Sequence, residues 1–330
     1  MEKISLIVPV FNRPDEVREL LESLTEQTVG SFELIIVEDG SQTKCVDVVA
    51  EYAGKLNISY HLIENGGPGP ARNFGAKLAS GDFLIVLDSD CILPPGYIQA
   101  VRQGVEATQA DVFGGPDRAA EHFAPLQKAI NYSMTSFWTT GGIRGGQKKL
   151  DRFYPRSFNM GMWKHIYESI GGFARMRFGE DIDLSIRLHQ AGYRVKLLPE
   201  AWVYHKRRTD WRKFYRQVYN SGIARINLYK KYPHSLKAVH LLPALFTMGI
   251  VLCLATSAFS LWSLLPPLAY ALLVMLDAGL KNRSLKIGLL SVLASYIQLT
   301  GYGCGFISAV WNRLIRRKGE FSAFDKTFYK

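Results

Sequence analysis

The stretch LIIVEDGS at residues 34–41 is the clearest indicator of the fold, because an apolar run ends there in two acids and a Gly-Ser turn. Four successive Leu, Ile or Val residues are typical of a strand that is buried on both faces. In open α/β sheets, ligands bind outside the carboxyl ends of such strands. The two acids therefore mark a sheet edge at which we expect a ligand.

The same pattern recurs on either side of this stretch. We predict further buried strands and intervening helices, the strands over residues 4–10, 58–62 and 83–87 and the helices over residues 15–27, 45–53 and 69–79. Strands that alternate with helices, and that are continuous in Val, Ile and Leu, are typical of a mostly parallel sheet covered on both faces. The front of the chain is therefore predicted to be an α/β domain.

Charge divides the 330-residue chain into two regions. Residues 1–205 carry 21 Lys and Arg against 25 Asp and Glu, a balance of −4, whereas residues 206–330 carry 19 against 4, a balance of +15. This division predicts a soluble domain followed by a membrane region. Nucleic acid is disfavoured as a partner, because the basic residues flank apolar stretches and are not interleaved with exposed aromatic residues.

Three apolar blocks occupy the basic region, at residues 241–262, 264–280 and 287–311. Each is close to the ~20 residues that a spanning helix needs, which predicts C-terminal transmembrane helices. Basic clusters before the first block, after the second and after the third all favour the cytoplasmic side, and three full spans do not satisfy that preference. We therefore expect a hairpin of two spans, followed by a third block that breaks at Gly301–Gly305 and returns to the same side.

These patterns predict four segments along the chain: a catalytic domain over residues 1–210, a basic amphipathic interfacial segment over 211–235, a membrane region over 236–318 and a tail over 319–330. The start of the chain runs directly into a strand pattern, so we do not expect export of the front domain. The four cysteines lack disulfide or metal-ligand spacing and are expected to be reduced. The predicted location is the cell inner membrane, multi-pass, with the catalytic domain in the cytoplasm.

Polar segments follow the predicted strands, namely VPVFN at residues 8–12, VEDGS at 37–41, NGGPGPARN at 65–73 and LDSD at 87–90. Asp39 lies where a nucleotide needs a carboxylate for its ribose or base. Asp88 and Asp90 suit a divalent cation, because hard carboxylate oxygens bind such ions. Arg72, on a helix after a Gly-rich loop, suits a phosphate or a base edge. Structural alternatives remain, since Asp-Gly-Ser is a common turn and an Asp after a strand often caps a helix.

Taken together, these segments resemble the inverting family 2 glycosyltransferases of the GT-A fold, a Rossmann-like fold, over roughly residues 1–225. The resemblance implies a nucleotide-sugar donor, most commonly a UDP-sugar, and a divalent cation, Mg²⁺ or Mn²⁺. The implied lining of the donor pocket consists of Pro9, Asn12, Asp39, Arg72 and Asp88. The implied ligands of the cation are Asp88, Asp90 and His205, the last of which is alternatively a structural histidine.

The segments SIGGF at residues 169–173 and FGEDIDL at 178–184 resemble the acceptor-side signature of the family. This implies that Gly172 and Glu180 lie on the acceptor side and that Asp181, the second acid of the Glu-Asp pair, is the general base. Acids at a helix start are also favoured by the helix dipole alone. The Gln-x-x-Arg-Trp motif of processive synthases is absent, which favours transfer of a single sugar.

The expected activity is transfer of one sugar to a hydroxyl of a membrane-associated, lipid-linked acceptor in polysaccharide or glycolipid synthesis, among membrane lipids. One alternative is a polyprenyl-phosphate glycosyltransferase, whose acceptor is already an anion. Another is a non-catalytic, membrane-anchored nucleotide-binding protein. Residues 111–157 lack a regular pattern, and we expect the Gly-rich, basic segment 141–156 to be a loop that closes over the donor or the acceptor.

Overall fold

The computed structural model describes residues 1–120, 123–141, 153–176, 178–207 and 209–319. The chain divides into two compact units. Among the described residues, the first, here called the sheet unit, holds residues 1–120 and 153–206. The second, here called the helical unit, holds residues 123–141 and 207–319. The helical unit therefore includes an internal segment that the boundaries predicted from the sequence assign to the catalytic domain.

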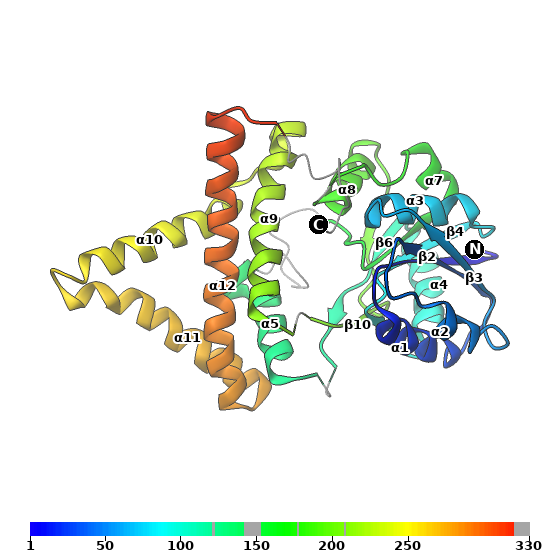
Figure 1. The fold of residues 1–330 in the computed structure, drawn as a ribbon, viewed down its shortest axis with the longest axis horizontal. Helices are drawn as coiled ribbons and strands as arrows, with labels where there is room; N and C mark the ends of the chain where they lie inside the picture. Colours follow the sequence, from blue (N-terminus) through cyan, green and yellow to red (C-terminus); the bar gives the residue numbers. More distant parts are fainter. Residues whose placement is uncertain (121–122, 142–152, 177, 208, 320–330) are drawn as a thin grey trace. The chain divides into compact units, whose positions relative to one another are not determined.

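A seven-stranded sheet forms the centre of the sheet unit, with the order β3-β2-β1-β4-β8-β6-β9 (Figure 1). Its strands in that order are β3 (Ile58–Ile63), β2 (Phe32–Asp39), β1 (Ile4–Val10), β4 (Phe83–Leu87), β8 (Asn159–Trp163), β6 (Val112–Gly114) and β9 (Val195–Leu197). The first four strands pair in parallel, β8 is antiparallel to both neighbours, and β6 pairs in parallel with β9. The prediction of a mostly parallel sheet is confirmed.

The strand register determines which side chains meet at the ligand-binding edge. β1 pairs with β2 from Ile4 opposite Phe32 to Val10 opposite Glu38. β4 lies on the other side of β1 in the same direction. Because parallel strands end at the same edge, the loops that begin after β1, β2 and β4 emerge together there.

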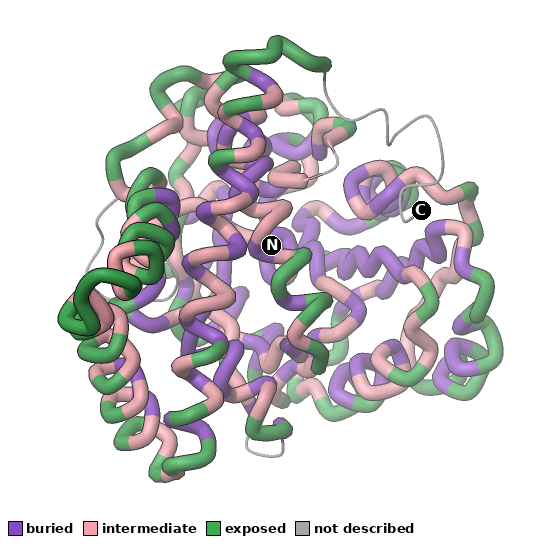
Figure 2. The backbone as a smooth tube through the Cα atoms, turned by 60° about the vertical axis from the view of Figure 1, so that its left-hand side comes forward, coloured by how far each residue is buried: buried purple, intermediate pink, exposed green. Residues whose placement is uncertain are grey.

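Helices cover both faces of the sheet. Two separate apolar clusters lie on the two faces, because successive residues of a strand point to opposite sides. One face packs against α1 (Pro14–Thr25), α2 (Val46–Ala50) and α4 (Tyr97–Thr108). The other packs against α3 (Pro68–Leu78), α7 (Lys164–Ser169) and α8 (Glu180–Gln190). Figure 2 shows the buried residues running through the interior, with exposed residues on the outer turns.

A small three-stranded sheet of the order β5-β10-β7 completes the sheet unit. Its strands are β5 (Cys91–Ile92), β10 (Val203–His205) and β7 (Asp117–Arg118). The antiparallel pairing of β10 with β5 places His205 opposite Cys91. This pairing brings the end of the predicted catalytic domain next to the segment that follows β4.

The helical unit consists of α5 (Pro125–Thr135), α6 (Phe137–Thr140), α9 (Trp211–Lys231), α10 (Leu242–Thr256), α11 (Leu265–Asn282), α12 (Leu285–Ala309) and short 3₁₀ turns at Pro233–Ser235, Ala238–His240 and Leu261–Leu264, with a π-helical end at Val310–Ile315. Three helical stretches are long and apolar enough to cross a membrane: Ala238–Thr256, Leu261–Asn282 and Leu285–Ile315. The prediction of C-terminal helices with the composition of transmembrane segments is confirmed.

The predicted break in the third apolar block is wrong, because α12 continues through its glycines. These glycines allow close packing of α9 on α12. A Cβ at Gly305 would lie 2.0 Å from the carbonyl oxygen of Tyr219, and one at Gly222 would lie 2.2 Å from that of Tyr302. Small residues let two helix backbones approach closely, and the helical hydrogen bonds are kept.

The predicted irregularity of residues 111–157 is wrong in part, because this region contains β6, β7, α5 and α6. The apolar side of α5 depends on distant partners, since Ala129, Ile130 and Met134 pack against Phe214 of α9 and Ala294 of α12. Most of the predicted closing loop 141–156 lies outside the described residues.

Candidate active site

The loop after β1 is bound to the loop after β2 through Asn12. Its Oδ1 accepts the backbone N–H groups of Gln42 and Thr43 at 2.8 and 2.9 Å, and its own N–H donates to Ser41 Oγ at 2.8 Å. Asn12 has a φ of 54°, a left-handed conformation that Asn tolerates better than most residues. Pro9, the other residue predicted here, is buried within β1 opposite Val37.

Asp39 binds the Gly-rich loop that precedes α3. Its carboxylate accepts the N–H groups of Gly66 and Gly67 at 2.7 and 2.8 Å, and Asn65 Nδ2 donates to its carbonyl oxygen at 2.7 Å. Burial raises the pKa of Asp39, although the two backbone hydrogen bonds act against that rise. Asp39 is 1% exposed, so its position between the loops is tightly constrained.

Arg72 joins the end of β4 to the start of α8. Its Nη2 donates to Asp88 Oδ1 at 2.7 Å and its Nη1 to Glu180 Oε1 at 3.1 Å. The guanidinium is 3% exposed and lies over the ring of Phe173 at 5.1 Å. Burial and the adjacent Asp181 raise the pKa of Glu180, while Arg72 opposes the rise. Arg72 thus connects the predicted donor side to the predicted acceptor side.

Asp90 lies between two groups that carry or accept a positive charge. Arg13 Nη1 donates to one carboxylate oxygen, and His205 Nε2 lies 3.1 Å from the other. Burial alone would raise the pKa of Asp90, but His205 and Arg13 outweigh burial and hold the pKa well below its usual range. The carboxylate is therefore ionised and available as a ligand. His205 itself stacks on Phe158 with ring centroids 4.7 Å apart.

The chemistry of this pair fits a divalent cation. Among the described residues, the group with potential ligand atoms within 4.8 Å of one another consists of Asp90, Cys91 and His205. Burial raises the pKa of the Cys91 thiol well above its usual value, and the sulfur donates to Phe158 O at 3.4 Å. The carboxylate oxygen of Asp90 and the imidazole of His205 suit such an ion, and His205 Nδ1 is buried without a hydrogen-bond partner. Asp88, the third predicted ligand, lies outside this group and forms an ion pair with Arg72.

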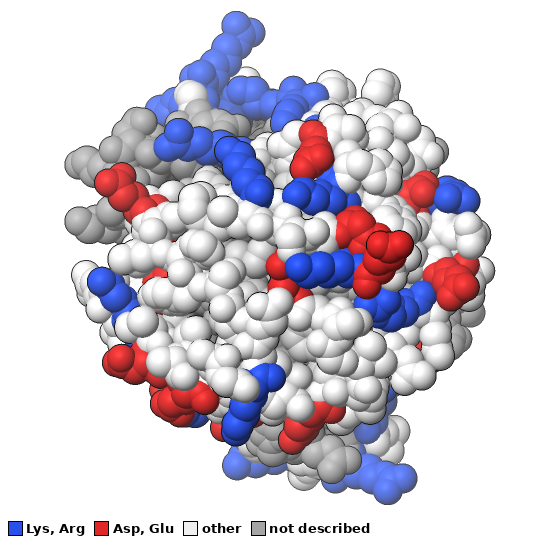
Figure 3. Space-filling view, turned by 90° about the vertical axis from the view of Figure 1, so that its right-hand side faces the viewer, with Lys and Arg blue, Asp and Glu red and all other residues white. Residues whose placement is uncertain are grey.

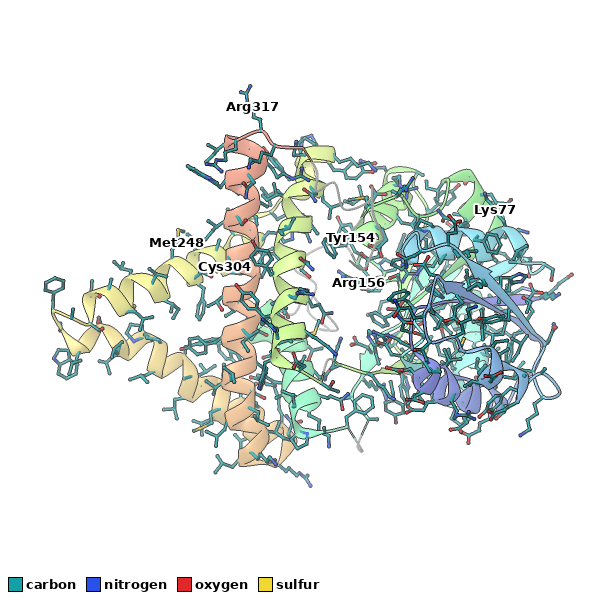
Figure 4. The ribbon with its side chains drawn as sticks, viewed as in Figure 1. Lys77, Tyr154, Arg156, Met248, Cys304 and Arg317 are labelled. Atoms are coloured by element: carbon teal, nitrogen blue, oxygen red, sulfur yellow. The ribbon has the colours of Figure 1, made fainter. Side chains whose placement is uncertain are left out.

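Asp181 lies in the first turn of α8, where the N-terminal end of a helix favours negative charge. Its Oδ1 accepts the N–H of Ile182 at 2.8 Å, and Arg156 Nε lies 2.7 Å from its Oδ2. The Asp181 side chain is 9% exposed, whereas Arg156 is 34% exposed. Arg156 lies in the segment before β8 (Figure 4). The predicted base is thus bound to a partly exposed cation.

The acceptor-side signature is held in place by Asn73, which follows Arg72 on α3. Asn73 accepts the N–H of Phe173 at 2.8 Å and donates to its carbonyl oxygen at 2.8 Å. Gly172 has a φ of 64°, and a Cβ there would lie 2.5 Å from Asn73 Oδ1, so glycine is required. Arg187 of α8 donates to the carbonyl oxygen of Gly172 at 2.7 Å.

The predicted residues form three clusters in the sheet unit. Asn12 and Asp39 bind neighbouring loops, Asp88 and Glu180 share Arg72, and Asp90 lies with His205. Sequence reasoning gave no role to Arg13, which directly follows Asn12, or to Asn73, which ends the motif at residues 65–73. Arg156 belongs to the basic segment 141–156 that is predicted to close over the donor or the acceptor, but its pairing with Asp181 was not predicted. On the face drawn in Figure 3, acidic and basic side chains are interspersed over a mostly uncharged surface.

Comparison with known proteins identifies the family. The model of glycosyl transferase family 2 matches residues 5–179, more than half of the chain. The chain belongs to this family. A solved structure is also similar to it: mannosyltransferase PcManGT from Pyrobaculum calidifontis, in complex with GDP-Man and Mn²⁺, matches with a TM-score of 0.64 and 17% identity over 94% of this chain and 87% of that one. The similarity confirms the predicted GT-A fold.

Two curated relatives are similar over part of the chain. EpsJ of Bacillus subtilis, an uncharacterized glycosyltransferase, is 27% identical over 214 residues, which are 60% of this chain and 59% of EpsJ. The poly(ribitol-phosphate) beta-N-acetylglucosaminyltransferase TarS of Staphylococcus aureus is 39% identical over 116 residues, 34% of this chain and 20% of TarS. The chain therefore spans less than two thirds of the length of these relatives.

Proposed function

We propose that the protein is an inverting glycosyltransferase that moves one sugar from a nucleotide-sugar, most commonly a UDP-sugar, to a hydroxyl of a membrane-associated, lipid-linked acceptor. The observation that carries the proposal is the bridge through Arg72. Asp88, two residues from Asp90, and Glu180, next to Asp181, both contact its guanidinium. This buried cation supports the proposal, because it joins Asp88, a predicted metal ligand, to the residue next to the predicted base.

The proposed reaction is a single displacement. Asp181 accepts the proton of the acceptor hydroxyl, and the hydroxyl oxygen bonds to the anomeric carbon. The bond from that carbon to the diphosphate oxygen breaks as the new bond forms, and the nucleoside diphosphate leaves with the electron pair. No enzyme nucleophile takes part, so the anomeric configuration inverts.

In this proposal, one group of residues binds the leaving nucleoside diphosphate, and Asp181 lies on the side of the acceptor. Asp90 and His205, with Asp88 as the third predicted ligand, would hold Mg²⁺ or Mn²⁺, which when bound neutralises the leaving diphosphate. Pro9, Asn12 and Asp39 line the nucleotide pocket in this proposal. Their loops are preorganised, because the hydrogen bonds of Asn12 and Asp39 order the backbone before a donor arrives.

The membrane region makes a lipid-linked acceptor the best fit. Three stretches have the length and composition to enter a bilayer, so an acceptor attached to lipid would be presented to the enzyme at the membrane surface. In this proposal the protein is a multi-pass protein of the cell inner membrane, and the sheet unit lies in the cytoplasm, where nucleotide-sugars are available. The domain limits are residues 1–210, 211–235, 236–318 and 319–330.

A polyprenyl phosphate is the second candidate acceptor, and one contact favours it. Arg156 Nε lies 2.7 Å from the carboxylate that would act as base, and a phosphate acceptor would engage this guanidinium. An acceptor that is already an anion needs no base. Replacing Asp181 is therefore expected to lower transfer to a hydroxyl acceptor but not transfer to a polyprenyl phosphate.

The deciding experiment follows transfer from a set of nucleotide-sugars in membranes that contain the full-length protein and lipid-linked acceptors. We expect Asp181→Asn to lose most transfer to a hydroxyl acceptor and Asp47→Asn, an exposed change on α2, to keep it. NMR of the product reports the anomeric configuration. Retained transfer in Asp181→Asn would favour the polyprenyl phosphate. Donor binding without transfer or hydrolysis for any donor and acceptor would instead support a non-catalytic binding protein.

A further inference from the structure

Helix α9 lies along most of α12 in the same direction (Figure 1). Val218, near the middle of α9, meets Gly301, near the middle of α12. Nine residues further along α9, Asn227 accepts a hydrogen bond from Arg313 at 2.8 Å. The two helices therefore run side by side in the same direction. If α12 crossed a membrane, α9 would cross it too.

Helix α9 is too polar to enter a bilayer. Its 21 residues carry basic side chains along their whole length: Arg212, Lys213, Arg216, Arg225, Lys230 and Lys231. Arg216, which is exposed, lies only two residues from Val218 and therefore close to the middle of α12. If α12 crossed the membrane, Arg216 would lie in the hydrocarbon without an acidic partner on α9, and such placement is costly.

Exposed large apolar side chains lie at the two ends of α12: Leu285, Leu289 and Leu293 in its first half, Ile307 near its end, and Trp311, Leu314 and Ile315 in the π-helical end that follows. At helical spacing most of them share one side, here called the apolar stripe. Elsewhere α12 is covered by α9, α5, α10 and α11, with Ala294, Gly301 and Gly305 buried. A helix with one exposed apolar stripe and polar protein behind it is typical of an element that lies in the plane of a membrane surface.

Helices α10 and α11 differ from α12 in how much of them the protein covers. Of the residues in their most apolar windows, 11% are buried in each, against 44% in α12. The two helices diverge from α12 and meet at a tip (Figure 1). At the tip Phe259 is 92% exposed and Leu261 and Trp262 are each 76% exposed. Large apolar side chains so exposed favour transfer out of water.

Aromatic side chains fasten both helices of this hairpin to the middle of α12. Phe246 of α10, Tyr270 of α11 and Tyr296 of α12 have ring centroids 5.2 to 5.7 Å apart. Tyr296 also donates to the carbonyl oxygen of Pro267 at 2.6 Å. Met248, two residues after Phe246 on α10, is exposed (Figure 4). The aromatic contacts therefore fix where the hairpin meets α12.

We propose that the α10–α11 hairpin is the part of the chain that enters the bilayer, and that α12 lies along the membrane surface with its apolar stripe against the acyl chains. The inference rests on the membrane attachment in the proposed function. Basic residues at both ends of α12 then lie on one side of the membrane, at anionic headgroups: Lys281, Arg283, Lys286, Arg316, Arg317 and Lys318. The preference of all basic clusters for one side is thereby satisfied with two inserted helices.

Depth measurements on the full-length protein test the orientation of α12. Single cysteines for spin labelling replace the exposed Leu285, Leu293, Ile307 and Leu314, with Cys253 and Cys304 changed to Ala, in vesicles of phosphatidylcholine and phosphatidylglycerol. We expect equal, shallow depths at all four positions and a greater depth for a label at Phe259. A spanning α12 would place positions 293 and 307 about 10 Å deeper than positions 285 and 314, since a helix rises ~1.5 Å per residue. That profile would overturn the inference.

The side of the membrane on which the chain ends is the second test. A reporter fused after Lys330 is expected on the same side as a reporter fused before Met1, because two inserted helices return the chain to its starting side. If the protein is bound to the membrane but its two ends lie on opposite sides, the proposed orientation of α12 is contradicted, whereas the proposed membrane attachment is not. Protein that stays in the soluble fraction contradicts the proposed membrane attachment as well.

A pair of variants identifies the tip as the inserting element. The double variant Phe259→Asp with Trp262→Asp is expected to be released from the same vesicles by a high-salt wash. Leu62→Asp, which introduces a charge at a residue of β3 that is 50% exposed, is expected to stay bound. Equal retention of both variants would show that the tip does not enter the bilayer, and would overturn the inference.

Discussion

The Nε atom of Arg156 lies 2.7 Å from the carboxylate of Asp181, the residue predicted to accept the proton of the acceptor. Arg156 comes from the segment before β8 and Asp181 from the first turn of α8, so this contact binds a loop to a helix. Because Arg156 is 34% exposed, an acceptor can reach the guanidinium from solvent. In the proposed reaction, this ion pair would link the position of Asp181 to that of an acceptor bound at Arg156.

Arg156→Gln is expected to lower kcat/KM for the acceptor about tenfold or more, the order of effect of one charge-assisted hydrogen bond. If Arg156 positions Asp181, kcat falls; if it binds an acceptor phosphate, the KM of the acceptor rises. Steady-state kinetics at varied acceptor concentration separates the two outcomes. Arg194→Gln breaks an exposed ion pair with Asp111 and is expected to leave both constants unchanged. Unchanged kinetics in Arg156→Gln would remove Arg156 from the site.

Asp90→Ala is expected to lower transfer at least about a hundredfold, as when one group that stabilises transition-state charge is removed. Titration calorimetry of nucleotide with and without Mn²⁺ is expected to show that the variant loses the metal-dependent part of binding. Circular dichroism and thermal unfolding check that the sheet unit remains folded. The matched change Asp47→Ala, exposed on α2, is expected to have no effect. Full activity of the parent protein in EDTA would contradict the metal assignment.

Arg13→Gln is expected to strengthen Mn²⁺ binding in the absence of nucleotide. The Arg13 guanidinium donates to the carboxylate of Asp90, so it competes with a cation for the same oxygen. Electron paramagnetic resonance of free Mn²⁺ during titration measures the affinity. Arg18→Gln is the control, because Arg18 lies on α1, which begins directly after Arg13, but pairs with the exposed Glu51. Equal or weaker Mn²⁺ binding in Arg13→Gln would show that the two cations do not compete.

Much of the sheet unit was predictable because its signals are local. Continuous apolar runs predicted β1 to β4, and the polar residues after each run predicted which side chains gather at one edge. Strand β8 was missed, since the run NMGMW at residues 159–163 is short, contains a glycine and has no β-branched residue. Its position depends on pairing with β4, more than 70 residues earlier in the chain.

The features that the sequence did not reveal depend on contacts between distant segments. Arg72 is predicted to face a phosphate or a base edge, and its ion pairs with Asp88 and Glu180 arise only because α8 lies beside α3. Glycines in α12 indicate a break when the helix is considered alone, but they permit close approach once α9 packs on it. In both cases the residue type was noticed, and the partner that determines its role was not.

Glu33→Gln is expected to lower stability at neutral pH and to flatten its dependence on acid. Burial by itself would raise the pKa of Glu33, but hydrogen bonds from Ser5 and Ser80 outweigh burial and lower the pKa to about 2. A carboxyl group with a depressed folded-state pKa stabilises the fold above its unfolded value of 4.5, and this stabilisation is lost as the pH falls from there towards 2. Thermal midpoints at several pH values between 7 and 2.5 measure it. Glu64→Gln, an exposed change, is expected to follow the parent curve.

Gly305→Ala is expected to destabilise the packing of α9 on α12, because the added Cβ would lie 2.0 Å from the backbone carbonyl oxygen of Tyr219. A backbone atom cannot rotate away, so the helices must separate, at a cost of about 1–3 kcal/mol for an overpacked interface. Thermal unfolding in detergent is expected to show a lower midpoint, and hydrogen exchange is expected to be faster in α9. Gly249→Ala on α10 is the matched control, since a Cβ there meets no atom within 4 Å. Equal midpoints for the two variants would show that close packing at Gly305 does not hold the two helices together.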